Sequence, residues 1–247
     1  MSELLRELDE MPLSLLDAEA DRLHQVLGGP TLVHLQGGRE PALFVCVLMH
    51  GNETSGWDAI RKVLHDHLHT EGFRLPRSLS LFIGNTEAAE KGVRHLPGQP
   101  DYNRVWPGSE THGTAEHELM KAVMDRMADR EIFASIDLHN NTGLNPHYAC
   151  VNVLEHQSLH LAALFGRTVV YFIRPRGVAS MAMAALGPSV TLECGKVGQE
   201  HGVDHASDYL RACLHLSEIP SHPVAGHDID LYHTVAIVRV PPEQPFA

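Results

Sequence analysis

Hydrophobic residues are arranged along this chain in two alternating patterns. Short hydrophobic runs predict strands at 31–35, 42–47, 80–83, 132–139, 148–153, 168–173 and 189–192. Longer segments in which hydrophobic residues recur every three or four positions predict helices at 55–69, 115–130, 156–165, 179–186 and 204–216. The alternation of the two patterns predicts a three-layer α/β/α sandwich with a mixed, largely parallel central sheet.

The remaining segments complete the predicted organisation. Leucines at partly helical spacing predict one or two short helices within residues 1–27, covering an edge of the sheet. The turn residues 36–39 predict a hairpin between the first two strands. Residues 85–114 show little periodicity, and a loop of that length is usually functional. We expect one catalytic domain over residues 1–227, followed by a short strand-rich tail at 228–247.

The composition and charge are those of an ordinary globular protein and exclude several partners. Of 247 residues, 43% are hydrophobic and 20% are charged. A net charge of −12 argues against binding to nucleic acid or to an anionic membrane surface. No hydrophobic run approaches the ~20 residues of a membrane span. The acidic start lacks a secretory signal, and four cysteines form no Cys-x-x-Cys pair, so we expect a cytoplasmic protein with buried, reduced thiols.

Candidate chemistry begins where the strand at 42–47 turns into the helix at 55–69. His50 and Glu53 lie in this turn, and Gly51 between them lets the backbone bend so that both side chains face one point. The carboxyl ends of strands are where open α/β sheets build their sites. An imidazole and a carboxylate are two of the three protein ligands that a catalytic zinc site needs.

His139 is the predicted third ligand, because the strand at 132–139 also ends in a histidine. Spacing alone is weak evidence in a chain with 19 histidines. Similar pairs occur in or beside the last helix, where no strand precedes them: His215/Glu218, His201/Asp204 and His205/Asp208. We interpret those three pairs as surface residues, and His50 with Glu53 as the metal site.

Glu193 follows the strand at 189–192 and is the candidate general base that takes a proton from the attacking water. The alternative is a capping or surface carboxylate. The long loop supplies Arg94 and Arg104, of which one can stabilise an oxyanion and the other can hold a substrate carboxylate. Ion pairs that anchor the loop are the alternative for both. Asp101 can hydrogen-bond a ligating histidine.

Four motifs occur in one order along the chain: His50-Gly51-Asn52-Glu53, Asp101-Tyr102-Asn103-Arg104, Asp137-Leu138-His139-Asn140 and Glu193-Cys194-Gly195. This ordered set resembles the succinylglutamate desuccinylase/aspartoacylase family of the zinc carboxypeptidase superfamily, from about residue 31 to residue 217. The resemblance implies a zinc carboxypeptidase-like fold. It also implies one Zn²⁺ ion bound by His50, Glu53 and His139, with Glu193 as the base.

The resemblance also implies roles for the loop residues. Asp101 corresponds to the partner of His50, and Asn103 and Arg104 correspond to the clamp on the substrate's carboxylate. Arg94 corresponds to the group that polarises the scissile carbonyl. The implied reaction is hydrolysis of the amide bond in an N-acyl amino acid or a similar small carboxylate. The alternatives are a metallocarboxypeptidase acting on peptides and a metal-binding protein without turnover.

Two features depart from the family. Its members usually carry a β-rich C-terminal domain that narrows the entrance to the site, and only the first strand or two of it is expected after residue 228. Either the pocket is more open or another subunit closes it, so a homo-oligomer is possible. Where the family places its acyl-specific residues, this chain has Arg174-Pro175-Arg176 and the apolar segment 181–185. The acyl group therefore stays open.

Overall fold

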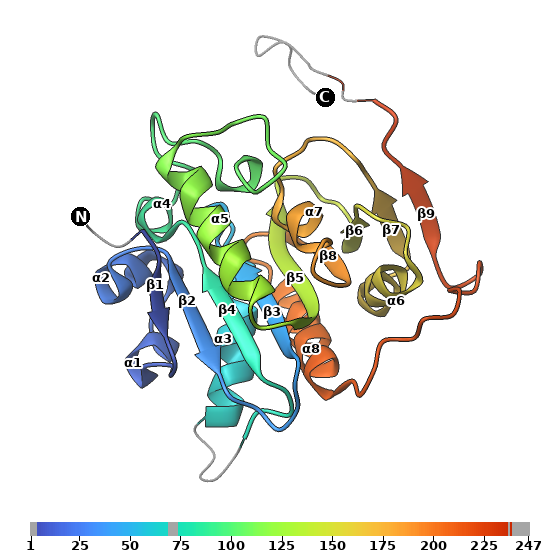
Figure 1. Ribbon diagram of the computed structural model, residues 1–247, viewed down its shortest axis with the longest axis horizontal. Helices are drawn as coiled ribbons and strands as arrows, with labels where there is room; N and C mark the ends of the chain where they lie inside the picture. Colours follow the sequence, from blue (N-terminus) through green and yellow to red (C-terminus); the bar gives the residue numbers. More distant parts are fainter. Residues whose placement is uncertain (1–3, 69–73, 237, 239–247) are drawn as a thin grey trace.

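The structure is a computed structural model that describes residues 4–68, 74–236 and 238. A nine-stranded sheet runs through this described part, with helices on both of its faces (Figure 1). In sheet order, its strands are β1 (Arg6–Leu8), β2 (Thr31–Leu35), β4 (Leu79–Ile83), β3 (Ala42–Val47), β5 (Ile132–Asn141), β8 (Ser189–Lys196), β6 (Tyr148–Val151), β7 (Thr168–Tyr171) and β9 (Asp230–His233).

Neighbouring strands are parallel except in the pairs β2–β4 and β6–β8. The predicted sandwich with a mixed, largely parallel sheet is therefore confirmed.

The helices form the two outer layers. One face of the sheet is covered by α1 (Leu13–Leu16), α2 (Leu23–Leu27), α3 (Ser55–Leu68), α6 (His156–Phe165) and α8 (Glu200–His215). The other face is covered by α5 (Ala115–Ala128) and α7 (Ala179–Met183). The helix predicted at 55–69 corresponds to α3, which is described as far as Leu68, and His69 lies outside the described residues. The last helix begins four residues before its predicted start at Asp204.

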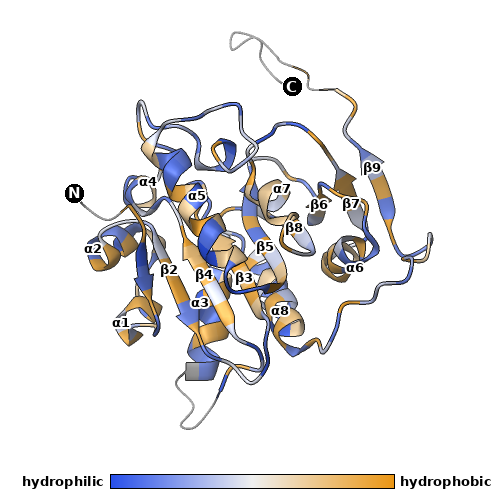
Figure 2. Cartoon of the chain, in the orientation of Figure 1, coloured by the Kyte–Doolittle hydropathy of each residue, from blue (hydrophilic) through white to orange (hydrophobic). Residues whose placement is uncertain are grey.

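The central strands are buried on both faces, which explains their continuous hydrophobic runs. Every residue of β3 is buried. Leu43, Val45 and Val47 pack into the core beneath α3 and α8, whereas Phe44 and Cys46 pack into the core beneath α5. Parallel strands covered by helices on both sides need hydrophobic residues at every position. Figure 2 shows the resulting hydrophobic centre of the sheet.

The predicted hairpin between β2 and β3 is wrong. β4 lies between these strands, antiparallel to β2 and parallel to β3. The glycines that suggested a turn serve a close crossing of two backbones instead. A Cβ atom on Gly37 would lie 2.1 Å from the carbonyl carbon of Arg77. The Gly37 amide also donates to Ser78 Oγ at 2.9 Å.

The N-terminal segment contains a strand that the leucine spacing did not predict. β1 pairs in parallel with β2 at the edge of the sheet. The short helices α1 and α2, with the 3₁₀ turn η1 (Ala20–Arg22) between them, follow as expected. Residues 1–3 lie outside the described residues. A three-residue edge strand leaves too short a pattern to be separated from helical spacing.

The long loop is more regular than predicted. It contains α4 (Thr86–Glu90) and the 3₁₀ turn η2 (Tyr102–Arg104). Both begin with a side-chain cap: Asn85 Oδ1 accepts from the Ala88 amide at 3.2 Å, and Asp101 Oδ1 accepts from the Asn103 amide at 2.8 Å. Asn and Asp are preferred at this position, so the signal was present in the sequence.

The C-terminal tail adds β9 to the edge of the sheet, parallel to β7. All residues of β9 are exposed. The domain boundary expected at residue 227 stays a prediction. The four cysteines are buried and unpaired, as predicted. Within the described residues, no helix is long and apolar enough to cross a bilayer.

Candidate active site

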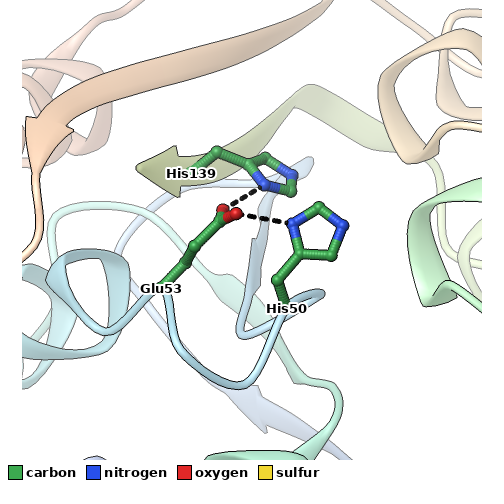
Figure 3. Close-up of side chains that lie close together, drawn as sticks. All are labelled: His50, Glu53 and His139. Atoms are coloured by element: carbon green, nitrogen blue, oxygen red, sulfur yellow. Dashed lines mark hydrogen bonds and ion pairs between the residues drawn. The ribbon is translucent and has the colours of Figure 1, made fainter. Parts of the chain in front are cut away.

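His50, Glu53 and His139 meet at the carboxyl ends of β3 and β5 (Figure 3). One ligand atom from each lies within 4.8 Å of the others, and all three side chains are buried. These three residues could hold a metal ion, and we call them the metal group. His50 Nδ1 is 2.9 Å from Glu53 Oε1, and His139 Nδ1 is 2.7 Å from Glu53 Oε2. In the described part of the chain, no other group of three or more His, Cys, Asp or Glu side chains meets this criterion. The three pairs near the last helix are therefore not part of such a group.

The turn after β3 is shaped by backbone packing. Leu48 has a φ of 57°, which is rare for a bulky residue and turns the chain out of the strand. Gly51 is required for close contact with α4, because a Cβ atom there would lie 2.3 Å from the carbonyl carbon of Ala88 and the amide nitrogen of Ala89. The turn thus brings His50 and Glu53 to the same point.

His139 and Glu193 are direct neighbours in the sheet. Both lie within strands that run further than predicted, β5 to Asn141 and β8 to Lys196, and the register pairs them. The Oε2 atom of Glu193 is buried and makes no hydrogen bond. Burial raises the pKa of this carboxyl group, and the positive charge of His139 opposes the shift only in part. A carboxylate with a raised pKa beside a metal group is suited to accept and return a proton.

A carboxylate contacts the Nε2 atom of each of the two histidines, His50 and His139. His50 Nε2 lies 2.9 Å from Asp101 Oδ1, which is the contact expected for Asp101. His139 Nε2 lies 2.9 Å from Asp137 Oδ2. Such partners orient the rings and leave Nδ1 available to a metal. Asp137 occurs in one of the four motifs, but its contact with His139 was not predicted, although residues two apart on a strand face the same side.

The buried charges of the group favour a cation. Burial acts to raise the pKa of Glu53, but His139 and His50 outweigh it and lower the pKa well below the usual range. Burial acts to lower the pKa of His139, but Asp137 and Glu53 raise it well above the ordinary value. His50 Nδ1 is buried and lacks a hydrogen bond of normal geometry. Two imidazoles and a carboxylate fit a divalent metal such as Zn²⁺.

Arg94 and Arg104 line the same cavity but differ in their hydrogen-bond partners. Arg94 donates from Nε and Nη2 to Asp101 Oδ2, at 3.2 and 2.9 Å, and from Nη1 to Glu53 Oε1 at 3.2 Å. Arg104 has no ion pair within the described residues, and its Nη1 donates to the Asn103 carbonyl at 2.6 Å. Of the two arginines, Arg104 is therefore the one that has no carboxylate partner within the described residues.

Asn103 is buried and its amide is engaged within the protein. Its Nδ2 atom lies 3.1 Å from Asp137 Oδ2 and 2.9 Å from His139 Nε2. Its Oδ1 atom accepts from the Ala179 amide at 2.7 Å. In this structure the amide therefore supports His139 and the start of α7. The predicted role of Asn103 in clamping a substrate carboxylate stays a prediction.

These side chains line an open cavity of about 300 Å³, at the small end of the range for ligand pockets. The predicted residues in its lining are the metal group, Glu193, Asn103 and both arginines. The lining also includes residues to which the sequence analysis assigned no role: Asn140, Asn141, Thr142, Cys150, Phe172, Pro175, Val178 and Thr191.

The succinylglutamate desuccinylase/aspartoacylase catalytic domain matches residues 39–218, well over half of the chain. The chain belongs to this family. Within it, a succinylglutamate desuccinylase of Pseudomonas fluorescens (strain Pf0-1) is 33% identical over 81 residues. That stretch is 32% of this chain and 23% of the Pseudomonas protein.

Solved structures agree with the family's fold. The succinylglutamate desuccinylase from Chromobacterium violaceum superposes with a TM-score of 0.68 at 18% identity, covering 86% of this chain and 75% of that one. A metallo-carboxypeptidase from Burkholderia cenocepacia superposes with a TM-score of 0.58 at 14% identity, covering 74% of this chain and 60% of that one. The predicted zinc carboxypeptidase-like fold is therefore confirmed.

Proposed function

We propose that this family member is a zinc-dependent hydrolase that cleaves the amide bond of an N-acyl amino acid or a similar small carboxylate. The observation that carries the proposal is Glu193. Its unbonded carboxylate oxygen is buried beside His139 and lines the same cavity as the metal group. A protein that only stored or sensed a metal would not need a base there. Family membership adds that the substrate is a small molecule.

The residues of the cavity divide the chemistry among them. A Zn²⁺ ion held by His50, Glu53 and His139 would supply a Lewis acid that polarises a carbonyl and makes water more acidic. Glu193 accepts a proton from the attacking water as the new carbon–oxygen bond forms. It returns that proton to the amine nitrogen as the carbon–nitrogen bond breaks.

The two arginines bind and orient the substrate in this proposal, and Asp101 holds one of them in place. Arg94, held by Asp101, stabilises the negative charge that develops on the carbonyl oxygen. Arg104, which has no carboxylate partner within the described residues, binds the carboxylate of the substrate. Asp101 therefore serves both His50 and Arg94.

Zinc dependence and a Glu193→Gln variant test the proposal. Metal-stripped protein should gain hydrolysis of N-acyl amino acids on addition of zinc and lose it with a chelator. Glu193→Gln should bind one zinc ion per chain and lose roughly 10²- to 10⁴-fold in kcat/KM, the usual contribution of general acid–base catalysis. Glu200→Gln is the matched control, because Glu200 is exposed on α8, and should keep full activity.

Two results would contradict the proposal. Undiminished hydrolysis by Glu193→Gln would remove the carboxylate from the reaction. Tight zinc binding without hydrolysis of any compound would favour the metal-binding alternative. Short peptides assayed beside the acyl amino acids distinguish the proposed deacylase from a metallocarboxypeptidase.

A further inference from the structure

One wall of the cavity is formed by uncharged side chains from β6, β8 and the segment between β7 and α7. We call Cys150, Phe172, Val178 and Thr191 the neutral wall. Thr191 lies two residues before Glu193 on β8, so both face the same side of the sheet. Cys150 is the partner of Thr191 across β6 and β8. The wall therefore begins directly beside the proposed base.

The polar groups at this wall are already used by the protein. Thr191 Oγ1 donates to Ser180 Oγ at 2.8 Å, and Ser180 Oγ donates to Asn152 Oδ1 at 2.7 Å. Asn152 Nδ2 in turn donates to the Phe172 carbonyl at 3.0 Å. Thr191 contributes the only hydroxyl among the four residues of the wall, and the proton of this hydroxyl is donated to Ser180. A carboxylate placed here would lose its water without gaining a hydrogen bond from these groups.

Two carboxylates, those of Asp137 and Glu193, adjoin Thr191 in this wall. Asp137 pairs with Thr191 across β5 and β8, is fully buried, and has an Oδ1 atom without a hydrogen bond. Glu193 lies one row further along the same face. Burial raises the pKa of the Cys150 thiol, and the two carboxylates raise it further. A second carboxylate on the substrate would therefore meet repulsion.

The cavity holds one cation for a substrate carboxylate. Arg94 is engaged by two carboxylates of the protein, whereas Arg104 forms no ion pair within the described residues. Arg174 and Arg176 do not line the cavity. The side chain of Arg174 is 66% exposed and lies 3.9 Å from Glu110. Charge matching at this site thus favours a ligand with one carboxylate near Arg104.

We infer that the substrate's amino acid carries a single carboxylate, bound by Arg104, and a small uncharged side chain that packs against the neutral wall. The inference rests on the proposed function and narrows it. It separates this chain from the relatives whose names denote a succinylated glutamate. The inference does not extend to the acyl group. Asn141 lines the cavity two residues past His139, on the side away from Asp137, and its buried amide makes no hydrogen bond.

The test is a matrix of substrates for the zinc-loaded protein of 247 residues. Alanine, valine, aspartate and glutamate are each supplied as the N-acetyl and the N-succinyl compound. Within each acyl series, we expect kcat/KM for alanine and valine to exceed that for aspartate and glutamate by on the order of 100-fold, because an unpaired buried charge is costly. Equal or faster cleavage of the acidic compounds would overturn the inference and leave the proposed function standing.

A gain of function at the wall provides a second test. Phe172→Arg adds a cation to the cavity at a partly exposed position and should shift selectivity toward aspartate and glutamate by roughly 10-fold or more. Ile173→Arg is the matched control: Ile173 is 53% exposed and outside the catalytic cavity, so the variant should keep the selectivity of the unchanged protein. An equal shift in both variants would show a general charge effect and overturn the inference.

Binding decides the question even if no compound is hydrolysed. Zinc-loaded Glu193→Gln is titrated with the same compounds in a calorimeter. Tighter binding of the alanine and valine compounds supports the inference, and tighter binding of the acidic compounds overturns it. Absence of hydrolysis by the unchanged protein would count against the proposed function alone.

Discussion

Glu193 shows how a single residue can be kept at a cost to stability. Burial raises its pKa above the ordinary 4.5 of glutamate, so the folded metal-free protein binds this proton more tightly than the unfolded chain does. The stability that this bound proton contributes is therefore fully present below the pKa of Glu193 in the unfolded chain. It is lost as the pH rises through the pKa of Glu193 in the folded protein. At neutral pH the charged carboxylate opposes folding.

The Glu193→Gln variant should consequently raise the Tm of metal-free protein near pH 7. The difference from the unchanged protein should shrink as the pH falls below the ordinary glutamate pKa. Thermal unfolding at a series of pH values measures this, with roughly 2–4 °C expected for each kcal/mol in a chain of this size. A difference that stays constant with pH would show that the titration of Glu193 is not its cause. Glu200→Gln again serves as the control.

At the scale of elements, the metal group depends on contact between two local structures, the turn after β3 and α4. Gly51 packs against the α4 backbone, and its amide donates to the Arg94 carbonyl at 3.0 Å. Asp101, which supports His50, comes from the same long loop as α4. The turn and the loop are therefore positioned together.

Gly51→Ala should separate these elements and weaken metal binding. A methyl group 2.3 Å from backbone atoms cannot be accommodated without a shift of the turn or of α4. We expect zinc affinity, measured by competition with a chelator, to fall by roughly 10- to 100-fold, as for the loss of groups that orient metal ligands. Gly29→Ala is the matched control, because no atom lies within 4 Å of the added carbon. Equal zinc affinity in both variants would refute this dependence.

At the scale of the whole molecule, the metal group joins parts of the chain that are distant in sequence. His50 and Glu53 follow β3, His139 lies on β5, and Asp101 comes from the long loop. The ligands are assembled only when the sheet has formed. A metal that binds the folded chain alone stabilises it in proportion to the logarithm of its concentration.

Zinc should therefore raise the Tm of the whole protein. At a free concentration 100 times Kd the gain is about 2.7 kcal/mol, which corresponds to roughly 5–10 °C for a chain of this size. His50→Ala should abolish the shift. His215→Ala, which changes an exposed histidine at the end of α8, should retain it. Calorimetry measures the shift in Tm. An equal shift in both variants would place the bound metal elsewhere.

Local patterns determined which elements form and which side chains carry the chemistry. The hydrophobic run at 42–47 is buried on both faces and predicted β3, because a strand covered on both sides needs such residues. The periodic segment at 156–165 predicted α6 with its observed bounds. His50, Glu53 and His139 were predicted to form a metal site because imidazole and carboxylate ligands are chemically recognisable, and the structure brings the three side chains together.

The tertiary structure alone decided which of these parts are neighbours. The insertion of β4 beside β2, the register that pairs His139 with Glu193, and the neutral wall all join residues far apart in sequence. Such pairings depend on the packing of whole faces and on the entropy of closing long loops, which no local window of sequence contains. The sequence by itself thus determined the chemical groups of this site, and only the fold decided that the proposed base, Glu193, lies beside the metal group and that the uncharged wall lies beside Glu193.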